Sequence, residues 1–176
     1  RGSGLEAEAV RYKSGKDFVN AGACSTFSEY AVISENRVVR ISEGVKSDAA
    51  SLLGCAVPTG AGIVDSAVIG FTHKLAVFGV GGIGASALMR AASKGVDCTA
   101  FDIVSWKLKW ACKNIGVNTA NIIVDNVSYG VSPDDINNFH ALFDFTIECS
   151  GNKVAMEMAF EGLKNNGTAI IAGNLE

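Results

Sequence analysis

One stretch of the sequence decides the fold, Leu75-Ala76-Val77-Phe78-Gly79-Val80-Gly81-Gly82-Ile83-Gly84. Its first four residues form a continuous apolar run, which is typical of a strand buried on both faces of a parallel sheet. The glycines that follow have the G-x-G-x-x-G spacing, and the alanine-rich segment 83–94 predicts a helix directly after them. A strand, a glycine turn and a helix in this order predict a dinucleotide-binding site.

The glycines of this turn have separate predicted roles. Gly79 permits the tight turn, and Gly81 lets the backbone approach a pyrophosphate without a Cβ in the way. Gly84 lets the helix pack closely on the strand. Gly82 and Ile83 open the helix, whose N-terminus supplies N–H groups and a partial positive charge for an anion. All five residues are therefore candidates for binding a cofactor.

An acidic residue, Asp102, follows the predicted strand over 97–101 and lies 23 residues beyond Gly79. A carboxylate there can accept hydrogen bonds from both hydroxyls of an adenosine ribose and would repel a 2′-phosphate. The next residues, 103–105, include no arginine, which favours NAD over NADP. Two alternatives are a loop or helix-capping aspartate and an S-adenosylmethionine enzyme, because those enzymes also place an acid after a glycine turn.

The alternation of strand and helix continues around this turn. It predicts further strands over 121–124, 143–149 and 168–172 and helices over 105–114 and 153–163. Because parallel strands need crossover connections, we expect an α/β fold with a doubly wound parallel Rossmann-type sheet. Before it, a β-rich piece is indicated by strand patterns over 27–33 and 37–41, followed by a helix that starts at Ser47. The i,i+4 spacing of Trp106 and Trp110 indicates ordinary core packing.

The composition excludes several classes of protein. With 48% hydrophobic and 19% charged residues, the 176-residue chain can bury a sizeable core and is not predicted to be disordered. Its net charge of −3, without a basic stripe, gives no basis for binding nucleic acid or an anionic membrane, and no apolar run is long enough to cross a bilayer. Five scattered cysteines predict a reducing, cytoplasmic location. Residues 1–4 have the sequence of a linker scar and are left out of the fold prediction.

Several motifs together resemble the zinc-containing medium-chain alcohol dehydrogenases. They are the Gly79–Gly84 turn, Asp102, Phe27-Ser28-Glu29-Tyr30, the run Leu53-Gly54-Cys55-Ala56-Val57-Pro58-Thr59-Gly60, and Glu148-Cys149-Ser150-Gly151-Asn152. The resemblance covers the chain from about Lys13 onward. It implies an oxidoreductase that uses NAD and zinc and transfers a hydride between a small alcohol or aldehyde substrate and the nicotinamide.

The resemblance also implies roles for individual residues. Cys55 matches a ligand of the catalytic zinc, and Thr59 would lie close to the nicotinamide. Ile83 would pack an aliphatic side chain against the cofactor, and Lys107 would contact the adenosine ribose. Residues Cys149, Ser150 and Gly151 would line the nicotinamide end, with Cys149 acting as a core residue near the cofactor and not as a nucleophile.

Two domains are implied by the same resemblance. Residues 1–54 would be the C-terminal part of the catalytic (GroES-like) domain, and residues 55–176 the NAD-binding domain, truncated before its sixth strand. Because the family's other zinc ligands are not found, we expect the isolated chain to bind NAD weakly and to be inactive. A zinc-free quinone or enoyl reductase relative and a non-catalytic dinucleotide-binding module stay open as alternatives. The sequence does not decide the oligomeric state, and a homodimer is one alternative.

Overall fold

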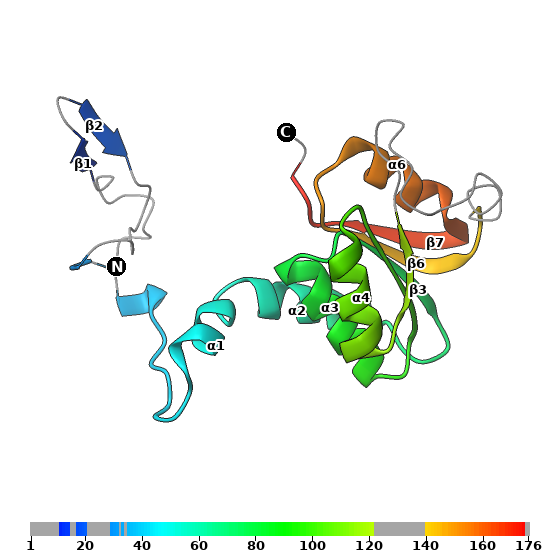
Figure 1. The fold of residues 1–176 in the computed structure, drawn as a ribbon, viewed down its shortest axis with the longest axis horizontal. Coiled ribbons are helices and arrows are strands. Elements are labelled where there is room, and N and C mark those ends of the chain that lie inside the picture. The colour runs from blue at the N-terminus through cyan, green and yellow to red at the C-terminus, as the bar shows by residue number, and fades with distance from the viewer. Residues whose placement is uncertain are drawn as a thin grey trace. The chain divides into compact units, whose positions relative to one another are not determined.

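The structure is a computed structural model that describes residues 11–14, 17–20, 29–31, 33, 35–121 and 140–174. It divides into two compact units, Arg1–Val45 and Lys46–Glu176. The ribbon in Figure 1 shows the elements of each unit. The division after residue 45 reflects which residues pack together. The boundary after residue 54 between a catalytic and a coenzyme domain is a different one and stays a prediction.

The first unit contains a two-stranded antiparallel sheet of β1 (Arg11–Ser14) and β2 (Asp17–Asn20) and a short 3₁₀ helix, η1 (Glu35–Arg37). The strand predicted over 37–41 is wrong, because Arg37 ends η1 and residues 38–41 form no strand. Val38, Val39 and Ile41 are exposed, so these apolar side chains have no buried face that would stabilise a strand. Part of the predicted strand 27–33 lies outside the described residues.

The second unit alternates helices and parallel strands. Its elements are α1 (Ser47–Leu52), α2 (Ala56–Ser66), β3 (Lys74–Phe78), α3 (Gly82–Ser93), β4 (Asp97–Asp102), α4 (Ser105–Ile115), β5 (Asn118–Asn121), β6 (Phe143–Glu148), α6 (Lys153–Glu161) and β7 (Leu163–Ile171). No helix among the described residues is long and apolar enough to cross a membrane.

The five strands form one parallel sheet in the order β5-β4-β3-β6-β7. From β3 the chain first moves outward through β4 to β5 and then returns to the other side of β3 with β6. Helices α3 and α4 cover one face of the sheet and α6 covers the other (Figure 1). The predicted doubly wound Rossmann-type fold is therefore confirmed. The reversal of strand order creates a crevice between the carboxyl ends of β3 and β6.

Strand β3 contributes to the core on both faces of the sheet. Leu75 and Val77 pack into the cluster under α3 and α4, whereas Ala76 and Phe78 pack into the cluster under α6. Phe78 stacks on Phe101 of β4, with ring centroids 4.7 Å apart. Each fully buried large side chain of this kind contributes about 1.5–3 kcal/mol. The continuous apolar run of the sequence reflects this two-sided burial, which fixes the position of the glycine turn that follows.

The predicted elements of the second unit are mostly found within one or two residues. Strand β5 begins at Asn118, three residues earlier than the predicted start, where Asn118 pairs with Thr99 of β4. Residues 122–124 lie outside the described part. Strand β7 begins at Leu163, five residues earlier than predicted, with an irregular register opposite Phe143 and Phe145.

Helix α2 packs closely along α3. A Cβ at Gly60 would meet the backbone of Ile83 and Ala87, so only a glycine allows the two helices to come this close. At the other end of this contact, Asp65 of α2 accepts hydrogen bonds from the side chains of Arg90 of α3 and of Lys94, the C-cap residue of α3. These contacts bring the residues just before α2 to the same end of α3 as the glycine turn.

Candidate functional site

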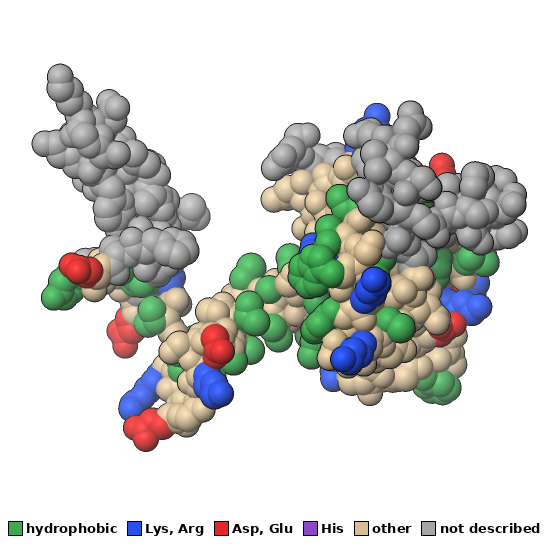
Figure 2. Space-filling model, viewed as in Figure 1, with side chains coloured by type: hydrophobic (Ala, Val, Ile, Leu, Met, Phe, Trp, Pro, Cys, Tyr) green, Lys and Arg blue, Asp and Glu red, His purple; other side chains and the backbone are tan. Residues whose placement is uncertain are grey.

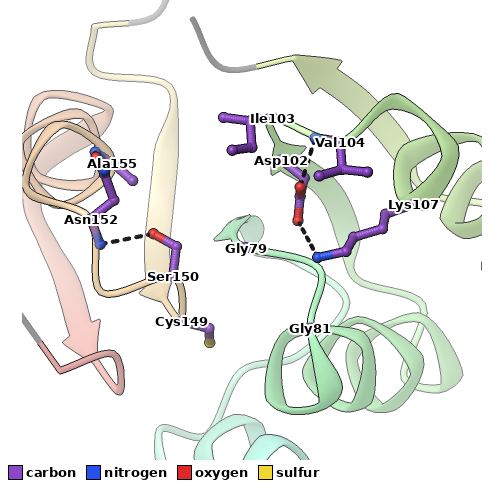
Figure 3. A pocket seen from close by; sticks show the side chains of 10 residues that line it. All are labelled: Gly79, Gly81, Asp102, Ile103, Val104, Lys107, Cys149, Ser150, Asn152 and Ala155. Atoms are coloured by element: carbon purple, nitrogen blue, oxygen red, sulfur yellow. Dashed lines mark hydrogen bonds and ion pairs between the residues drawn. The ribbon is translucent and has the colours of Figure 1, made fainter. Parts of the chain in front are cut away.

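A cavity of about 410 Å³ lies at the carboxyl edge of the sheet, where the strand order reverses (Figure 3). Its volume is in the range of small-molecule sites. It is lined by Gly79, Gly81, Asp102, Ile103, Val104, Lys107, Cys149, Ser150, Asn152 and Ala155. The site predicted from the glycine turn therefore coincides with a real hollow of the protein, and six of the predicted cofactor residues line it.

The glycine turn forms the floor of the cavity. Gly79 has a φ of +91°, which residues with a side chain rarely adopt, and its amide donates to the carbonyl of Phe101 at 2.7 Å. A Cβ at Gly84 would overlap the carbonyl oxygen of Gly79, so the first turn of α3 lies directly on the turn. A Cβ at Gly81 would meet nothing within 4 Å, so this backbone is open to a ligand.

The N-terminus of α3 faces this open backbone. Gly81 is the N-cap residue and offers no side chain to the first amides of the helix. The first N–H groups of a helix lack intrahelical partners and carry a partial positive charge. The arrangement is one that suits a phosphate or diphosphate group.

Asp102 forms one side of the cavity and is only 5% exposed. Its Oδ2 accepts a hydrogen bond from the amide of Val80 at 2.7 Å, and its Oδ1 accepts one from the amide of Val104 at 2.8 Å. The Nζ of Lys107 lies 3.6 Å from Oδ2. The carboxylate thus holds the glycine turn and the start of α4 together. Since a carboxylate offers about four acceptor positions, it keeps the capacity to accept from a ribose hydroxyl.

The opposite wall is the turn after β6, as the close-up in Figure 3 shows. Ser150 lies against the glycine turn, since a Cβ at Gly79 would be 3.0 Å from the nitrogen of Ser150. Asn152 caps α6 by accepting from the amides of Val154 and Ala155. Both walls therefore touch the glycine turn: Asp102 is hydrogen-bonded to it, and Ser150 packs against it.

Glu148 lies behind this second wall and is fully buried at the end of β6. Its Oε1 accepts hydrogen bonds from the amides of Ser150 at 2.7 Å and Gly151 at 3.0 Å, and from the hydroxyl of Ser150. Sequence reasoning did not include Glu148 among the candidate site residues. The available signal was a charged residue at the carboxyl end of a strand in the middle of the sheet, where a carboxylate needs several donors to be buried.

Cys149 contributes a half-buried thiol to the cavity. Burial, and then the negative charge of Glu148, raise the pKa of the Cys149 thiol to about 12. The group is therefore protonated at neutral pH, because a thiol loses its proton only near its pKa. A protonated thiol is a weak nucleophile, and the role of Cys149 as a core residue near the cofactor stays a prediction.

The remaining predicted cofactor residues do not line the cavity. Gly82, Ile83 and Gly84 all lie in the first turn of α3, and Gly84 packs against the backbone of Gly79. Gly151 has a positive φ and stands behind Ser150, where its amide is held by Glu148. Thr59 is exposed on α2, one turn beyond Cys55.

Cys55, the candidate zinc ligand, is exposed and occupies the N-cap position of α2. The next residue, Ala56, lies close to Gly82, since a Cβ at Gly82 would be 2.9 Å from that of Ala56. Within the described ranges, no three histidine, cysteine or acidic side chains are grouped so that they could hold a metal ion. A single thiolate does not hold zinc, so these residues do not fit a zinc site by themselves.

A second, apolar hollow of about 360 Å³ adjoins the cavity and shares Gly81 and Lys107 with it. Trp106 and Trp110 line it and are 67% and 40% exposed. The prediction that these tryptophans pack in the core is wrong, because the buried face of α4 is formed by Leu108 and Ala111. Hydrophobic side chains are accordingly visible on the surface over α3 and α4, among separate lysines and arginines (Figure 2).

The fold defines the chain as a Rossmann-type α/β protein with a cavity at the sheet reversal. No family model matches the sequence. The chain is 35% identical over 167 residues to an S-(hydroxymethyl)glutathione dehydrogenase of Komagataella pastoris, which covers 90% of this chain and 43% of that protein. It is 31% identical over 162 residues to an alcohol dehydrogenase class-3 of Cereibacter sphaeroides, which covers 85% of this chain and 42% of the relative.

A solved structure gives the same result. The benzyl alcohol dehydrogenase of Acinetobacter calcoaceticus superimposes with a TM-score of 0.71 and 25% identity, over 85% of this chain and 41% of that one. The resemblance to zinc-containing medium-chain alcohol dehydrogenases is therefore confirmed. The chain spans less than half the length of these relatives.

Proposed function

We propose that this chain is the coenzyme-binding part of a zinc-dependent, NAD-linked alcohol dehydrogenase. The observation that carries the proposal is one cavity lined jointly by the glycine turn, Asp102 and Ser150 at the sheet reversal. The complete enzyme would transfer a hydride between a small alcohol or aldehyde and the nicotinamide. The similarity to alcohol dehydrogenases over nine tenths of the chain supports this activity.

The proposed coenzyme position follows from the chemistry of the walls. The diphosphate would lie at Gly81 and the N-terminus of α3, where amides and the helix dipole favour negative charge. The adenosine ribose would lie at Asp102 and Lys107, and the nicotinamide half at the turn of residues 149–151. In this position the aliphatic side chain of Ile83 and the hydroxyl of Thr59 would lie near the nicotinamide half. When bound, the nicotinamide supplies the hydride chemistry, and the residues of this chain bind and orient it.

The same geometry supports NAD over NADP. The carboxylate of Asp102 would accept from a 2′-hydroxyl but repel a 2′-phosphate. Lys107 already lies near this carboxylate, and no arginine is present in residues 103–105 to neutralise an added phosphate. We therefore propose NAD as the coenzyme.

Cys55 is proposed as one thiolate ligand of zinc in the complete enzyme. Its companion ligands would come from other parts of that protein, and we assign no step of the reaction to the metal. A cytoplasmic location is proposed from the scattered cysteines. Two copies could pair through the edge of β7, which has no strand partner on its outer side among the described residues.

Calorimetric titration of the folded chain with NADH and NADPH tests the proposal. We expect NADH to bind with one site per chain. NADPH should bind about tenfold more weakly or worse, because its 2′-phosphate would lie beside the negative charge of Asp102. Trp106 and Trp110 lie beside the cavity, so energy transfer from tryptophan to NADH gives a second readout. A folded sample that ignores NADH, or that binds both coenzymes equally, contradicts the proposal.

A further inference from the structure

The buried carboxylate of Glu148 has no role in the function proposed above, although it is fully buried. Ionised groups are rarely buried unless several donors or a cation stabilise them. Among the described residues, Glu148 forms no ion pair with lysine or arginine. Its charge is balanced instead by the amides of Ser150 and Gly151 and the hydroxyl of Ser150.

These hydrogen bonds determine where the cavity wall lies. Ser150 is held on one side by Glu148 and rests on the other side against Gly79 of the glycine turn. The hydroxyl of Ser150 also accepts from the amide of Asn152 at 3.2 Å, and Asn152 caps α6. Two residues that line the cavity are thus connected to one buried carboxylate.

Glu148 is itself held firmly in place. Its backbone carbonyl accepts hydrogen bonds from the amides of Ala172 at 2.8 Å and Gly173 at 3.0 Å, just after β7. A Cβ at Gly173 would lie 2.5 Å from Oε2 of Glu148, so the backbone closes over the carboxylate. The carboxylate therefore has little room to move, and its hydrogen bonds hold the turn of Ser150 and Gly151 in one position.

We propose that Glu148 is a positioning residue, whose carboxylate fixes the Ser150–Gly151 turn and thereby sets the affinity of the cavity for the nicotinamide half of the coenzyme. The inference rests on the proposed function and adds a residue to that site. Glu148 does not line the cavity, so it acts through Ser150 and not by contact with the ligand.

The variant Glu148→Gln tests this role with almost no change in volume. Three donors bind Oε1 of Glu148, and a neutral amide oxygen accepts them less strongly than a carboxylate oxygen does. The NH₂ group that replaces Oε2 would also face the N–H of Gly151, so two donors would meet. We expect NADH to bind about tenfold more weakly, because hydrogen bonds to a charged acceptor are the stronger ones. ADP-ribose, which lacks the nicotinamide, should change by less than about twofold.

The control is Glu157→Gln, the same substitution at an exposed position of α6, which should bind both ligands as the wild type does. The readout is the ratio of the two dissociation constants by calorimetry. Loss of both ligands in parallel would assign Glu148 a merely structural role, and unchanged binding of both would show that the turn does not depend on it. Either result overturns the inference.

A second variant covers the case in which Glu148→Gln does not fold. Ser150→Ala removes the hydroxyl that donates to Glu148 but keeps both amides, and it should weaken NADH selectively and by a smaller factor. If both variants fold, their combination should lose less than the product of the single losses, because the residues act through one network. Equal effects on NADH and ADP-ribose, or independent effects of the two substitutions, contradict the proposal. A wild type that binds neither ligand would contradict the proposed function instead.

Discussion

The carboxylate of Asp102 accepts a hydrogen bond from the amide of Val80 at 2.7 Å, so the residue that ends β4 holds the turn that follows β3. This contact gives Asp102 two duties. It fixes the glycine turn at the floor of the cavity, and it presents its remaining acceptor capacity to a ligand. In the sequence, Asp102 could be either an aspartate that stabilises a loop or an acceptor for a ribose. In the structure its carboxylate stabilises the loops and keeps acceptor positions for a ribose hydroxyl.

The variant Asp102→Ala should therefore lose both stability and affinity. The amide of Val80 would be left buried without its acceptor, which costs about 1–3 kcal/mol of unfolding free energy. NADH affinity should fall and the preference over NADPH should shrink, because the repelling charge is gone. Thermal unfolding and calorimetry check the two effects. Asp97→Ala, at the opposite end of β4 and exposed, is the control and should leave binding unchanged. Unaltered NADH affinity in Asp102→Ala would refute the role of this residue.

Two glycines of the turn separate ligand approach from protein packing. Gly81→Ala adds a Cβ that meets no protein atom within 4 Å, at a negative φ that alanine accepts, so the melting temperature should not change. The same Cβ points into the proposed diphosphate position and should lower NADH affinity by about tenfold or more, as expected when a backbone can no longer approach its ligand.

Gly84→Ala gives the opposite result. Its Cβ would overlap the carbonyl oxygen of Gly79, and overpacking of this kind costs about 1–3 kcal/mol or more. The melting temperature should fall before any effect on binding is considered. If Gly81→Ala destabilises the protein as much as Gly84→Ala, or if it binds NADH normally, the assignment of the turn is wrong.

The core strands could be predicted because their signal is local. β3 is an apolar run buried by the sheet itself, and the glycine turn after it has a fixed spacing. β4 and β6 mix polar with apolar residues but alternate with helices at a regular distance along the chain. The strand predicted over 37–41 failed because branched residues favour a strand only when a partner and a covering face exist, and Val39 is 91% exposed. The strands β1 and β2, in contrast, were not predicted. Their sequence signal is the aromatic and branched residues Tyr12, Phe18 and Val19 on either side of a glycine at position 15.

The candidate site was predictable only in part, for the same physical reason. The residues that approach a ligand through backbone, such as Gly81, are recognisable from spacing. The contacts from Asp102 to Val80 and from Glu148 to Ser150 depend on how side chains turn at the ends of neighbouring strands. Periodicity also placed Trp106 and Trp110 on one helix face but did not say which face is buried.

The ion pairs between α2 and α3 predict a dependence of stability on pH. Hydrogen bonds from Arg90 and Lys94 hold the pKa of Asp65 below its usual value of 3.8. A carboxyl group with a lowered pKa in the folded state stabilises the fold above that usual value and loses this effect as the pH falls below it. Asp65→Asn should therefore melt at a lower temperature than the wild type at pH 7, and the difference should shrink as the pH is lowered below 3.8.

Salt gives an independent check of this prediction. The pairs are exposed, so 1 M salt should reduce the difference between Asp65→Asn and the wild type at pH 7. Glu157→Gln, which breaks a longer pair of 3.8 Å within α6, is the control and should barely move the melting temperature. A difference that persists at low pH and high salt would mean that Asp65 acts through packing and not through its charge.

The proposed zinc ligand makes different predictions for this chain and for the complete enzyme. Cys55 is exposed, and the described residues offer it no companion ligands, so the chain alone should not retain zinc after dialysis against a chelator. The complete enzyme should hold zinc. Loss of a residue that only hydrogen-bonds to a zinc ligand lowers zinc affinity about 10- to 100-fold, and Cys55→Ser, which removes a ligand itself, should lower it further. Metal analysis of both proteins is the measurement, with Cys112→Ser, another exposed cysteine, as the control. Zinc that survives Cys55→Ser in the complete enzyme would exclude this thiolate, whereas an enzyme with no zinc at all would favour the zinc-free reductase relatives.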